Sequence, residues 1–491
     1  MKEASERELS ETEKTDANGK PWGAFIDNGP ADWQILQQDA EGRARIRASG
    51  RWAPKESMGL LGAAGGTVEL RLVREDSGTP VSGELNWRAA ETGAKGAWSG
   101  ELYPVPAGGP YRLETRFNPK GNKLGEWSLR GDMRHFLGVG DLWILAGQSN
   151  ASGYGRSAYD DGPELGLHML RHNGAWALAS HPLNDATASV FPRSRETYNT
   201  GHSPFLHFAR ILKRETGHPI GLLPAALGGS PLAAWHPETG PLFANLKAMV
   251  DRAGGRVKGM LWYQGETDAE PGKAEDYLER FLAGAAGWRK ALGREDLPIL
   301  TVQLARYRSE KPGEEDREWS LVREAQRQAA LRASGITVTP ALDLPLDDTI
   351  HIGTAGNLTL GARLAGCALG LDRNPGAGSA WKAPDLIECA LEDGQVVRLR
   401  FAPVLSRLES HDPKAMPFRV EDEDGPVPIG KVLYFHRDSA KLFLAKAPRG
   451  KVAVSCGYGE NPDMLPMDVE RQMPVLAFHA VPAAAHGESA C

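Results

Sequence analysis

The alternation of apolar and polar residues marks out the first part of the chain as strand-rich. Between about residues 22 and 135, short alternating runs are separated by turn-forming pieces such as REDSGTP (74–80). A period of two is typical of strands with one buried face. The runs are ARIRASGRW (44–52), TVELRLV (67–73), GELNWRA (83–89) and YRLETRF (111–117). We therefore expect an N-terminal β-sandwich over residues 22–135.

The pattern changes from residue 136 to residue 373, where short apolar runs alternate with helix-length amphipathic segments. Helical spacing of apolar residues predicts helices over 204–217, with Ser203 as the N-cap, and over 274–293 and 319–335. Buried strands interleaved with helices are typical of parallel β-α units, so we expect an α/β/α sandwich with a five-stranded parallel sheet. The expected strands are Leu142–Ala146, Ile220–Ala226, Val257–Tyr263, Leu297–Ala305 and Ile336–Leu344.

Strand-like runs return after residue 374, whereas the first residues of the chain show no pattern of strands or helices. The runs QVVRLRFAPV (395–404), KVLYFHR (431–437), AKLFLAKA (440–447) and KVAVSCGYG (451–459) predict a small C-terminal β domain over 374–491. Residues 1–21 are rich in charge and lack an apolar stretch, which predicts a disordered polar tail.

Composition and charge narrow the class of protein. The chain has 491 residues, with 57 basic and 63 acidic side chains, a net charge of −6 and 41% hydrophobic residues. This is typical of a globular protein of several domains and disfavours a nucleic-acid partner. No apolar run is long enough to cross a bilayer, so we expect no membrane partner. The start of the chain lacks the apolar core of a secretory signal, which predicts a cytoplasmic protein or, if a signal has been removed, a periplasmic or secreted one.

The cysteines and histidines predict no metal site. The four cysteines form no CxxC pair, and Cys389 and Cys456 are the two that could form a disulfide, although free thiols are the expectation. His135, His202, His207, His218 and His236 do not fall into a metal-ligand spacing. We therefore expect neither a metal nor another cofactor.

Two short motifs follow the first and last strands of the predicted parallel sheet, where ligands of such sheets bind. Ser149 lies in Gly147–Gln148–Ser149–Asn150 directly after the first strand. Asp348 and His351 stand three residues apart after the last strand, so one turn can place the carboxylate against a ring nitrogen. Each motif alone is weak, but the two together indicate a serine nucleophile with an acid–histidine pair.

Four blocks together resemble a known family. GDLWILAGQSNASGYG (140–155), GLLPAALGGSPLAAWHP (221–237), MLWYQGETD (260–268) and D-x-x-H (348–351) occur in the order found in the SGNH hydrolases. They are most similar to the branch of sialate O-acetylesterases and acetylxylan esterases, in which GQSN replaces the usual GDS. The resemblance covers about half of the chain and implies an SGNH-type sandwich for its middle region.

The resemblance also implies roles for individual residues. Ser149 would be the nucleophile, His351 the general base and then acid, and Asp348 the residue that orients the imidazole. Donors to the oxyanion would be the Ser149 N–H, a glycine N–H from Gly228–Gly229 (Gly229 is favoured) and the side-chain amide of Gln264.

Several neighbouring residues have two interpretations. Asp347 is the alternative partner of His351. Glu266 and Asp268 could bind sugar hydroxyls or brace the loop that carries Gln264. Trp235 could form a stacking wall for a sugar ring or belong to the core.

The sequence therefore predicts a serine esterase that removes O-acetyl groups from a carbohydrate, similar to the sialate O-acetylesterases, through an acetyl-serine intermediate. The alternatives are an esterase for acetylated xylan or pectin, and a glycan-binding protein without activity. The expected partner is an acetylated carbohydrate, and the sequence does not predict an oligomeric state.

Overall fold

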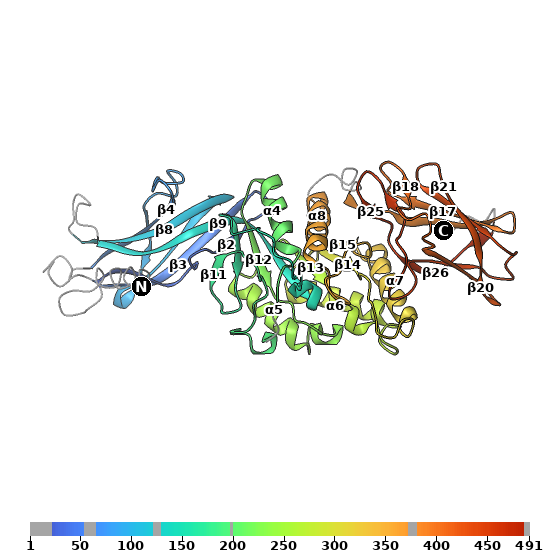
Figure 1. The fold of residues 1–491 in the computed structure, drawn as a ribbon. Coiled ribbons are helices and arrows are strands. Elements are labelled where there is room, and N and C mark those ends of the chain that lie inside the picture. The colour runs from blue at the N-terminus through green and yellow to red at the C-terminus, as the bar shows by residue number, and fades with distance from the viewer. Residues whose placement is uncertain (1–21, 54–64, 121–128, 197–199, 372–380, 486–491) are drawn as a thin grey trace.

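The computed structural model describes residues 22–53, 65–120, 129–196, 200–371 and 381–485. Its strands and helices form three parts in a row, with a β-rich part at either end and a mixed α/β part between them (Figure 1). The expected polar tail (1–21) and the expected boundary at 373/374 lie outside the described residues.

The N-terminal part consists of two sheets, whose strands are antiparallel except for the parallel pair of β2 and β9. One sheet has the order β1 (Gly23–Asn28), β3 (Arg43–Ala53), β7 (Ala97–Pro106) and β6 (Glu91–Thr92). In the other sheet, β4 (Gly66–Arg74) pairs along its whole length with β8 (Gly108–Pro119), and β8 pairs with β9 (Leu129–Gly147). The short strand β5 (Arg88–Ala89) pairs with β4, and the short strand β2 (Ile35–Gln37) pairs with β9. The expected strand over 83–89 is largely wrong, since only Arg88 and Ala89 are strand and the rest is turn.

Strand β9 joins the first two parts. Its 19 residues pair with β8 in the first part and then with β12 and β13 in the second. The expected boundary between residues 135 and 136 therefore falls inside one strand, next to Phe136, whose φ is +55°. Because one strand belongs to both sheets, the two parts are connected through backbone hydrogen bonds as well as through side chains.

The middle part is built on a mostly parallel sheet with the strand order β11-β10-β12-β9-β13-β14-β15. The five expected strands are all present and adjacent: β9, β12 (Ile220–Pro224), β13 (Gly259–Tyr263), β14 (Ile299–Gln303) and β15 (Ile336–Pro340). The sheet is larger than expected, because β10 (Leu167–Leu170) adds a parallel strand and β11 (Trp176–Leu178) an antiparallel one. The strands that follow β9 in the sequence lie on both sides of it in the sheet, first β10 to β12 and then β13 to β15. The carboxyl end of β9 is therefore a switch point of the topology.

Five helices cover this sheet. Helices α4 (Phe205–Thr216) and α8 (Thr354–Leu371) lie on one side of it, and α5 (Pro241–Arg252) and α6 (Tyr277–Ala291) on the other (Figure 1). Helix α7 (Asp316–Arg332) packs next to α6 and faces the C-terminal part. The three expected helices are confirmed as α4, α6 and α7. Ser203 is not the N-cap of α4, because the cap position is Pro204 and no side chain caps the helix.

The C-terminal part contains three small antiparallel sheets, apart from one parallel pair between β16 (Asp385–Glu392) and β27 (Ala484–Ala485). Their strand orders are β21-β22-β17-β16-β27, β18-β24-β25 and β20-β19-β23-β26. The remaining bounds are β17 (Val396–Ala402), β18 (Leu408–Glu409), β19 (Phe418–Asp422), β20 (Gly425–Val427), β21 (Ile429–Phe435), β22 (Ser439–Leu444), β23 (Ala453–Cys456), β24 (Met467–Asp468), β25 (Met473–Pro474) and β26 (Phe478–Pro482).

Three large hydrophobic clusters correspond to the three parts. One gathers around Leu70, Leu113 and Phe117, the second around the parallel sheet, and the third around Leu399, Phe401 and Val454. We propose that these clusters are the cores of three domains, at about residues 22–135, 136–373 and 374–491, with β9 shared by the first two. Cys367, Cys389 and Cys456 are buried free thiols. Within the described part of the chain, no helix has both the length and the apolar character needed to span a membrane.

Candidate active site

The candidate nucleophile lies where β9 ends and a single helical turn begins. Gly147 is the last residue of β9 and has a φ of +130°, and a Cβ there would stand 1.9 Å from the carbonyl oxygen of Tyr263. Only glycine tolerates this approach of two strands. Ser149 then opens the short helix α3 (Ser149–Ser152) at the switch point of the sheet. Its side chain is partly exposed, and its Oγ makes no hydrogen bond with any described residue.

The two residues that flank Ser149 hold its surroundings in place. Asn150 is 4% exposed and hydrogen-bonds on both sides of His351: its Nδ2 donates to Ile350 O (3.2 Å), and its Oδ1 accepts from Ile352 N (3.0 Å). Gln148 accepts hydrogen bonds from Thr267 N (3.2 Å) and, more weakly, Gly265 N (3.4 Å), in the loop after β13. These bonds join the ends of β9, β13 and β15, so Ser149 lies beside the loop of His351.

Asp348 and His351 form the expected pair. His351 Nδ1 lies 2.8 Å from Asp348 Oδ2, while Asp348 Oδ1 accepts from the N–H groups of Ile350 (2.9 Å) and His351 (2.7 Å). Since a carboxylate only accepts, Nδ1 carries the proton in this contact, and in the neutral imidazole Nε2 is then the nitrogen with a lone pair. Partial burial raises the pKa of Asp348, but the hydrogen bonds from Ile350 and His351 outweigh it and hold that pKa below its usual value. Asp347 instead accepts from Arg156 N (2.7 Å).

Tyr154 and Glu196 form a wall beside the histidine that the sequence analysis did not identify. The Tyr154 ring stacks on His351, with centroids 4.5 Å apart and planes 16° apart. Its hydroxyl donates to Glu196 Oε1 (2.8 Å), which also accepts from Gly228 N (3.2 Å). Burial raises the pKa of Glu196 above its usual value despite these two bonds. No motif marks Glu196, so only its contacts reveal its place in the site.

The expected oxyanion donors differ in whether their N–H groups already have a hydrogen-bond acceptor within the protein. Gly228 N–H is engaged by Glu196, whereas Gly229 N–H has no acceptor among the described residues, and the φ of Gly229 is +63°. Gln264 is fully buried. Its amide nitrogen lies 2.6 Å from Asp268 Oδ2 and 3.2 Å from Ser230 O. The amide that was expected to donate to an oxyanion is thus committed to acceptors beneath the surface of the site.

Asp268 ties together three segments below the site. Its Oδ2 accepts from Leu232 N (2.7 Å) and from Gln264, and its Oδ1 from Arg280 Nη1 (3.0 Å). Because Asp268 is 1% exposed, a sugar hydroxyl cannot reach it in this conformation. These contacts fit the bracing interpretation.

Glu266 and Trp235 are also buried. Glu266 Oε1 accepts from Asn150 Nδ2 (2.8 Å), and burial, with a smaller contribution from the Asp268 charge, raises the pKa of Glu266 to about 7. Trp235 is 0% exposed; its Nε1 donates to Ser230 Oγ (3.1 Å) and its ring packs edge-on against Trp262. The interpretation of Trp235 as a stacking wall is therefore wrong, because its ring lies in the core.

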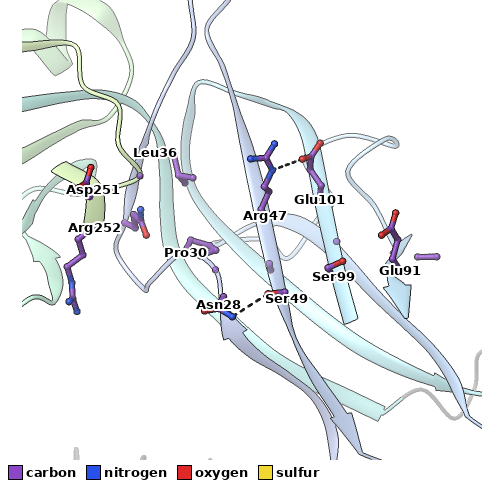
Figure 2. A pocket seen from close by; sticks show the side chains of 16 residues that line it. Asn28, Pro30, Leu36, Arg47, Ser49, Glu91, Ser99, Glu101, Asp251 and Arg252 are labelled. Atoms are coloured by element: carbon purple, nitrogen blue, oxygen red, sulfur yellow. Dashed lines mark hydrogen bonds and ion pairs between the residues drawn. The ribbon is translucent and has the colours of Figure 1, made fainter. Parts of the chain in front are cut away.

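A separate cavity lies away from these residues. It measures about 780 Å³ and is lined by strands β3 and β7 of the N-terminal part and by Asp251 and Arg252 at the end of α5 (Figure 2). It contains none of the candidate catalytic residues. The candidate catalytic serine and histidine therefore lie in the loops after β9 and β15 and not beside this cavity.

Comparison with known proteins identifies the class. The family model described as carbohydrate esterase, sialic acid-specific acetylesterase matches residues 139–369. A probable carbohydrate esterase of Arabidopsis thaliana is 30% identical over 250 residues, which cover 46% of this chain and 88% of that protein. The crystal structure of a carbohydrate acetylesterase from Xanthomonas citri covers 91% of this chain and 97% of its own, with a TM-score of 0.64 and 25% identity.

The fold and these likenesses define a carbohydrate esterase with a mixed α/β catalytic part. The chain belongs to the sialic acid-specific acetylesterase family of carbohydrate esterases. Human sialate O-acetylesterase is 26% identical over 264 residues, and this chain spans about half of its length (48%). The expected family and the expected class of enzyme are confirmed.

Proposed function

We propose that this esterase removes acetyl groups from a carbohydrate through an acetyl-Ser149 intermediate. The observation that carries the proposal is the hydrogen bond between Asp348 and His351, on a loop to which Asn150, the residue next to Ser149, is hydrogen-bonded. We further propose that the parallel sheet and its helices form an SGNH-type α/β/α sandwich, of which this site occupies the carboxyl edge.

The reaction has two half-reactions. His351 Nε2 takes the proton of Ser149 Oγ as this oxygen attacks the acetyl carbonyl, and the imidazolium then returns the proton to the sugar oxygen as the ester bond breaks. Water attacks the acetyl-serine in the same way and releases acetate. Asp348 keeps Nδ1 protonated and stabilises the imidazolium that forms in each step.

Two main-chain groups serve as oxyanion donors in this proposal. The N–H of Ser149 opens α3, where it has no partner within the helix, and the N–H of Gly229 has no acceptor among the described residues. Glu196 positions the adjacent Gly228 through its N–H. Gln264 supports the same turn from below through Ser230 O.

The preferred substrate in this proposal is an acetylated sialic acid, as in the family's sialate O-acetylesterases. Sialic acids carry a carboxylate, and Arg156 offers a cation at the site: its side chain is 69% exposed and its Nη2 lies 3.8 Å from Asp348 Oδ2. Acetylated xylan or pectin is the alternative. A neutral xylo-oligosaccharide would make no use of this charge.

Acetate release from two panels, acetylated sialic acids and acetylated xylo-oligosaccharides, tests the proposal. Wild-type protein should release acetate, and Ser149→Ala should reduce the rate to background, because no other group supplies the nucleophile. The control Ser157→Ala changes an exposed serine and should retain full activity. Quenched wild-type reactions should contain a chain heavier by one acetyl group, detected by mass spectrometry and absent in Ser149→Ala.

Each result has a distinct meaning. Undiminished activity of Ser149→Ala refutes the nucleophile assignment. Activity on xylo-oligosaccharides alone refutes the sialate preference but leaves the mechanism intact. Absence of acetate release from every substrate, together with glycan binding, would favour a non-catalytic glycan-binding protein.

A further inference from the structure

Asp161, His181 and His202 converge although about twenty residues separate each from the next. All three come from the long excursion between α3 and α4, and one potential ligand atom from each lies within 4.8 Å of the other two. Asp161 Oδ2 is 3.2 Å from His181 Nε2 and 3.5 Å from His202 Nε2. The two imidazole rings lie with centroids 4.2 Å apart.

These side chains are buried without partners of suitable geometry. Asp161 is 5% exposed and His202 is 6% exposed, and His181 is mostly buried. Asp161 Oδ2 and all four ring nitrogens of the two histidines make no directional hydrogen bond with any described residue. Buried polar atoms are normally satisfied, so three converging ligand atoms, one from each residue, without a directional hydrogen bond point to a missing common partner.

The spacing of the atoms fits a tetrahedral metal ion. Zinc binds imidazole nitrogen and carboxylate oxygen at about 2.0–2.2 Å, so ligand atoms around one tetrahedral ion stand roughly 3.3–3.5 Å apart. The two oxygen–nitrogen distances in the cluster, 3.2 and 3.5 Å, agree with that value. Two imidazoles and one carboxylate suit Zn²⁺ among the divalent metals and leave a fourth position for water.

The backbone around the cluster is already held in place. Arg210 of α4 donates from Nη2 to the main-chain oxygens of Asp161 (2.6 Å) and Gly162 (2.8 Å). His202 exchanges main-chain hydrogen bonds with Gly155 (3.0 and 2.9 Å), the residue after Tyr154. These bonds hold the main chain of Asp161 and His202 in place, so these two residues start from a fixed backbone.

We propose that Asp161, His181 and His202 form a binding site for a divalent transition metal, with Zn²⁺ as the preferred ion. The ion would fasten three loops of the 153–204 excursion to one another and, through His202 and Gly155, to the segment whose Tyr154 stacks on His351. Its role is structural, because no residue of the cluster belongs to the proposed acyl-transfer machinery. The three ligands share no recognisable spacing in the sequence, which is why no metal site is expected from the sequence.

Metal content and metal spectroscopy of the full chain, prepared without a histidine tag, test the site. Chelator-treated protein incubated with ZnCl₂ and passed through a desalting column should retain about one Zn²⁺ per chain, and its melting temperature should rise. With CoCl₂ it should show the visible absorption bands of tetrahedral Co²⁺. The variants Asp161→Asn and His181→Ala/His202→Ala should lower Zn²⁺ affinity by about 100-fold or more and remove these bands.

The control His411→Ala replaces an exposed histidine and should bind Zn²⁺ like the wild type. Asp161→Asn keeps the shape of the side chain, so it remains informative if the double variant fails to fold, which circular dichroism will show. Retention of one Zn²⁺ by a folded ligand variant overturns the proposal. Failure of the chelator-treated wild type to bind more Zn²⁺ or Co²⁺ than the variants overturns it as well.

Discussion

Asp347 and Asp348 are neighbouring carboxylates with different partners. Asp348 contacts the imidazole of His351, whereas Asp347 accepts from the main chain of Arg156. Asp348→Asn should lower kcat by up to about 10⁴-fold, because an amide can hold the wrong imidazole tautomer. Asp347→Asn is the matched control and should leave kcat near the wild-type value. Steady-state kinetics on an activated acetyl ester distinguish the two, and equal losses in both variants would contradict the assignment of Asp348.

Glu266 makes stability depend on pH. Burial raises its pKa to about 7 in the folded chain, so the folded state holds a proton that the unfolded state releases at about pH 4.5. The stability of the wild type should therefore fall as pH rises from about 4.5 to about 7, by roughly 3 kcal/mol at most. Above that range the loss should stay constant.

The variant Glu266→Gln should remove this dependence, because glutamine mimics the protonated acid. Thermal unfolding should show the variant to be more stable than the wild type at pH 8 and similar to it at pH 5. The control Glu238→Gln alters an exposed carboxylate and should follow the wild-type profile. A variant that is less stable than the wild type at pH 8 would contradict the prediction.

At the scale of elements, Asn150 connects α3 with the loops that follow β13 and β15. Asn150→Ala would leave Ile350 O, Ile352 N and Glu266 Oε1 without their partner. We expect a loss of about 1–3 kcal/mol in stability. We also expect a fall of about 10²-fold in kcat, because His351 would no longer be held beside Ser149. Unfolding curves and kinetics measure the two effects separately.

The control Asn245→Ala removes a single hydrogen bond, from α5 to Ser194 Oγ, and none to a candidate catalytic residue. It should lower stability slightly and leave kcat unchanged. Full activity of a folded Asn150→Ala variant would show that the loop of His351 is positioned by other contacts.

At the scale of the whole molecule, Arg323 of α7 fastens the C-terminal part to the parallel-sheet part. It is 1% exposed, and its guanidinium donates to main-chain oxygens on both sides of the interface. These are Leu304 O (3.1 Å) and Ala305 O (2.7 Å) on one side, and Gly459 O and Glu460 O (3.2 Å) on the other. Glu460 N also donates to Asp316 Oδ1 (2.9 Å).

Arg323→Leu should therefore cost about 3–5 kcal/mol, because several buried carbonyl oxygens lose their donor. Calorimetry should show the C-terminal part unfolding at a lower temperature than the rest. Arg332→Leu, on an exposed turn of the same helix, should change stability by no more than about 0.5 kcal/mol. A single transition at the wild-type temperature in Arg323→Leu would contradict this role.

The same contacts place the stretch Gly459–Glu460 at this interface. In the structure, Gly459 and Glu460 lie against the start of α7, where Gly459 N donates to Ser320 Oγ (2.8 Å). The stretch therefore belongs to the interface between the two parts.

The sequence by itself determined the features that depend on local pattern and residue chemistry. Continuous apolar runs identified β9 and β12 to β15, because strands buried on both faces need apolar residues throughout. Helical spacing identified α4, α6 and α7. Serine, histidine and aspartate at strand ends predicted the acyl-transfer chemistry that we propose, because few residue types can carry it out.

Only the tertiary structure decided the features that depend on contacts between distant residues. Asn150 bonds to Ile352, 202 positions away, and no local pattern predicts such a pair. The burial of Gln264 and Trp235, the two extra strands beyond β12, and the meeting of Asp161 with His181 and His202 are of the same kind. Polar side chains in loops follow no periodicity, so their partners are settled by how the loops pack and not by their spacing in the chain.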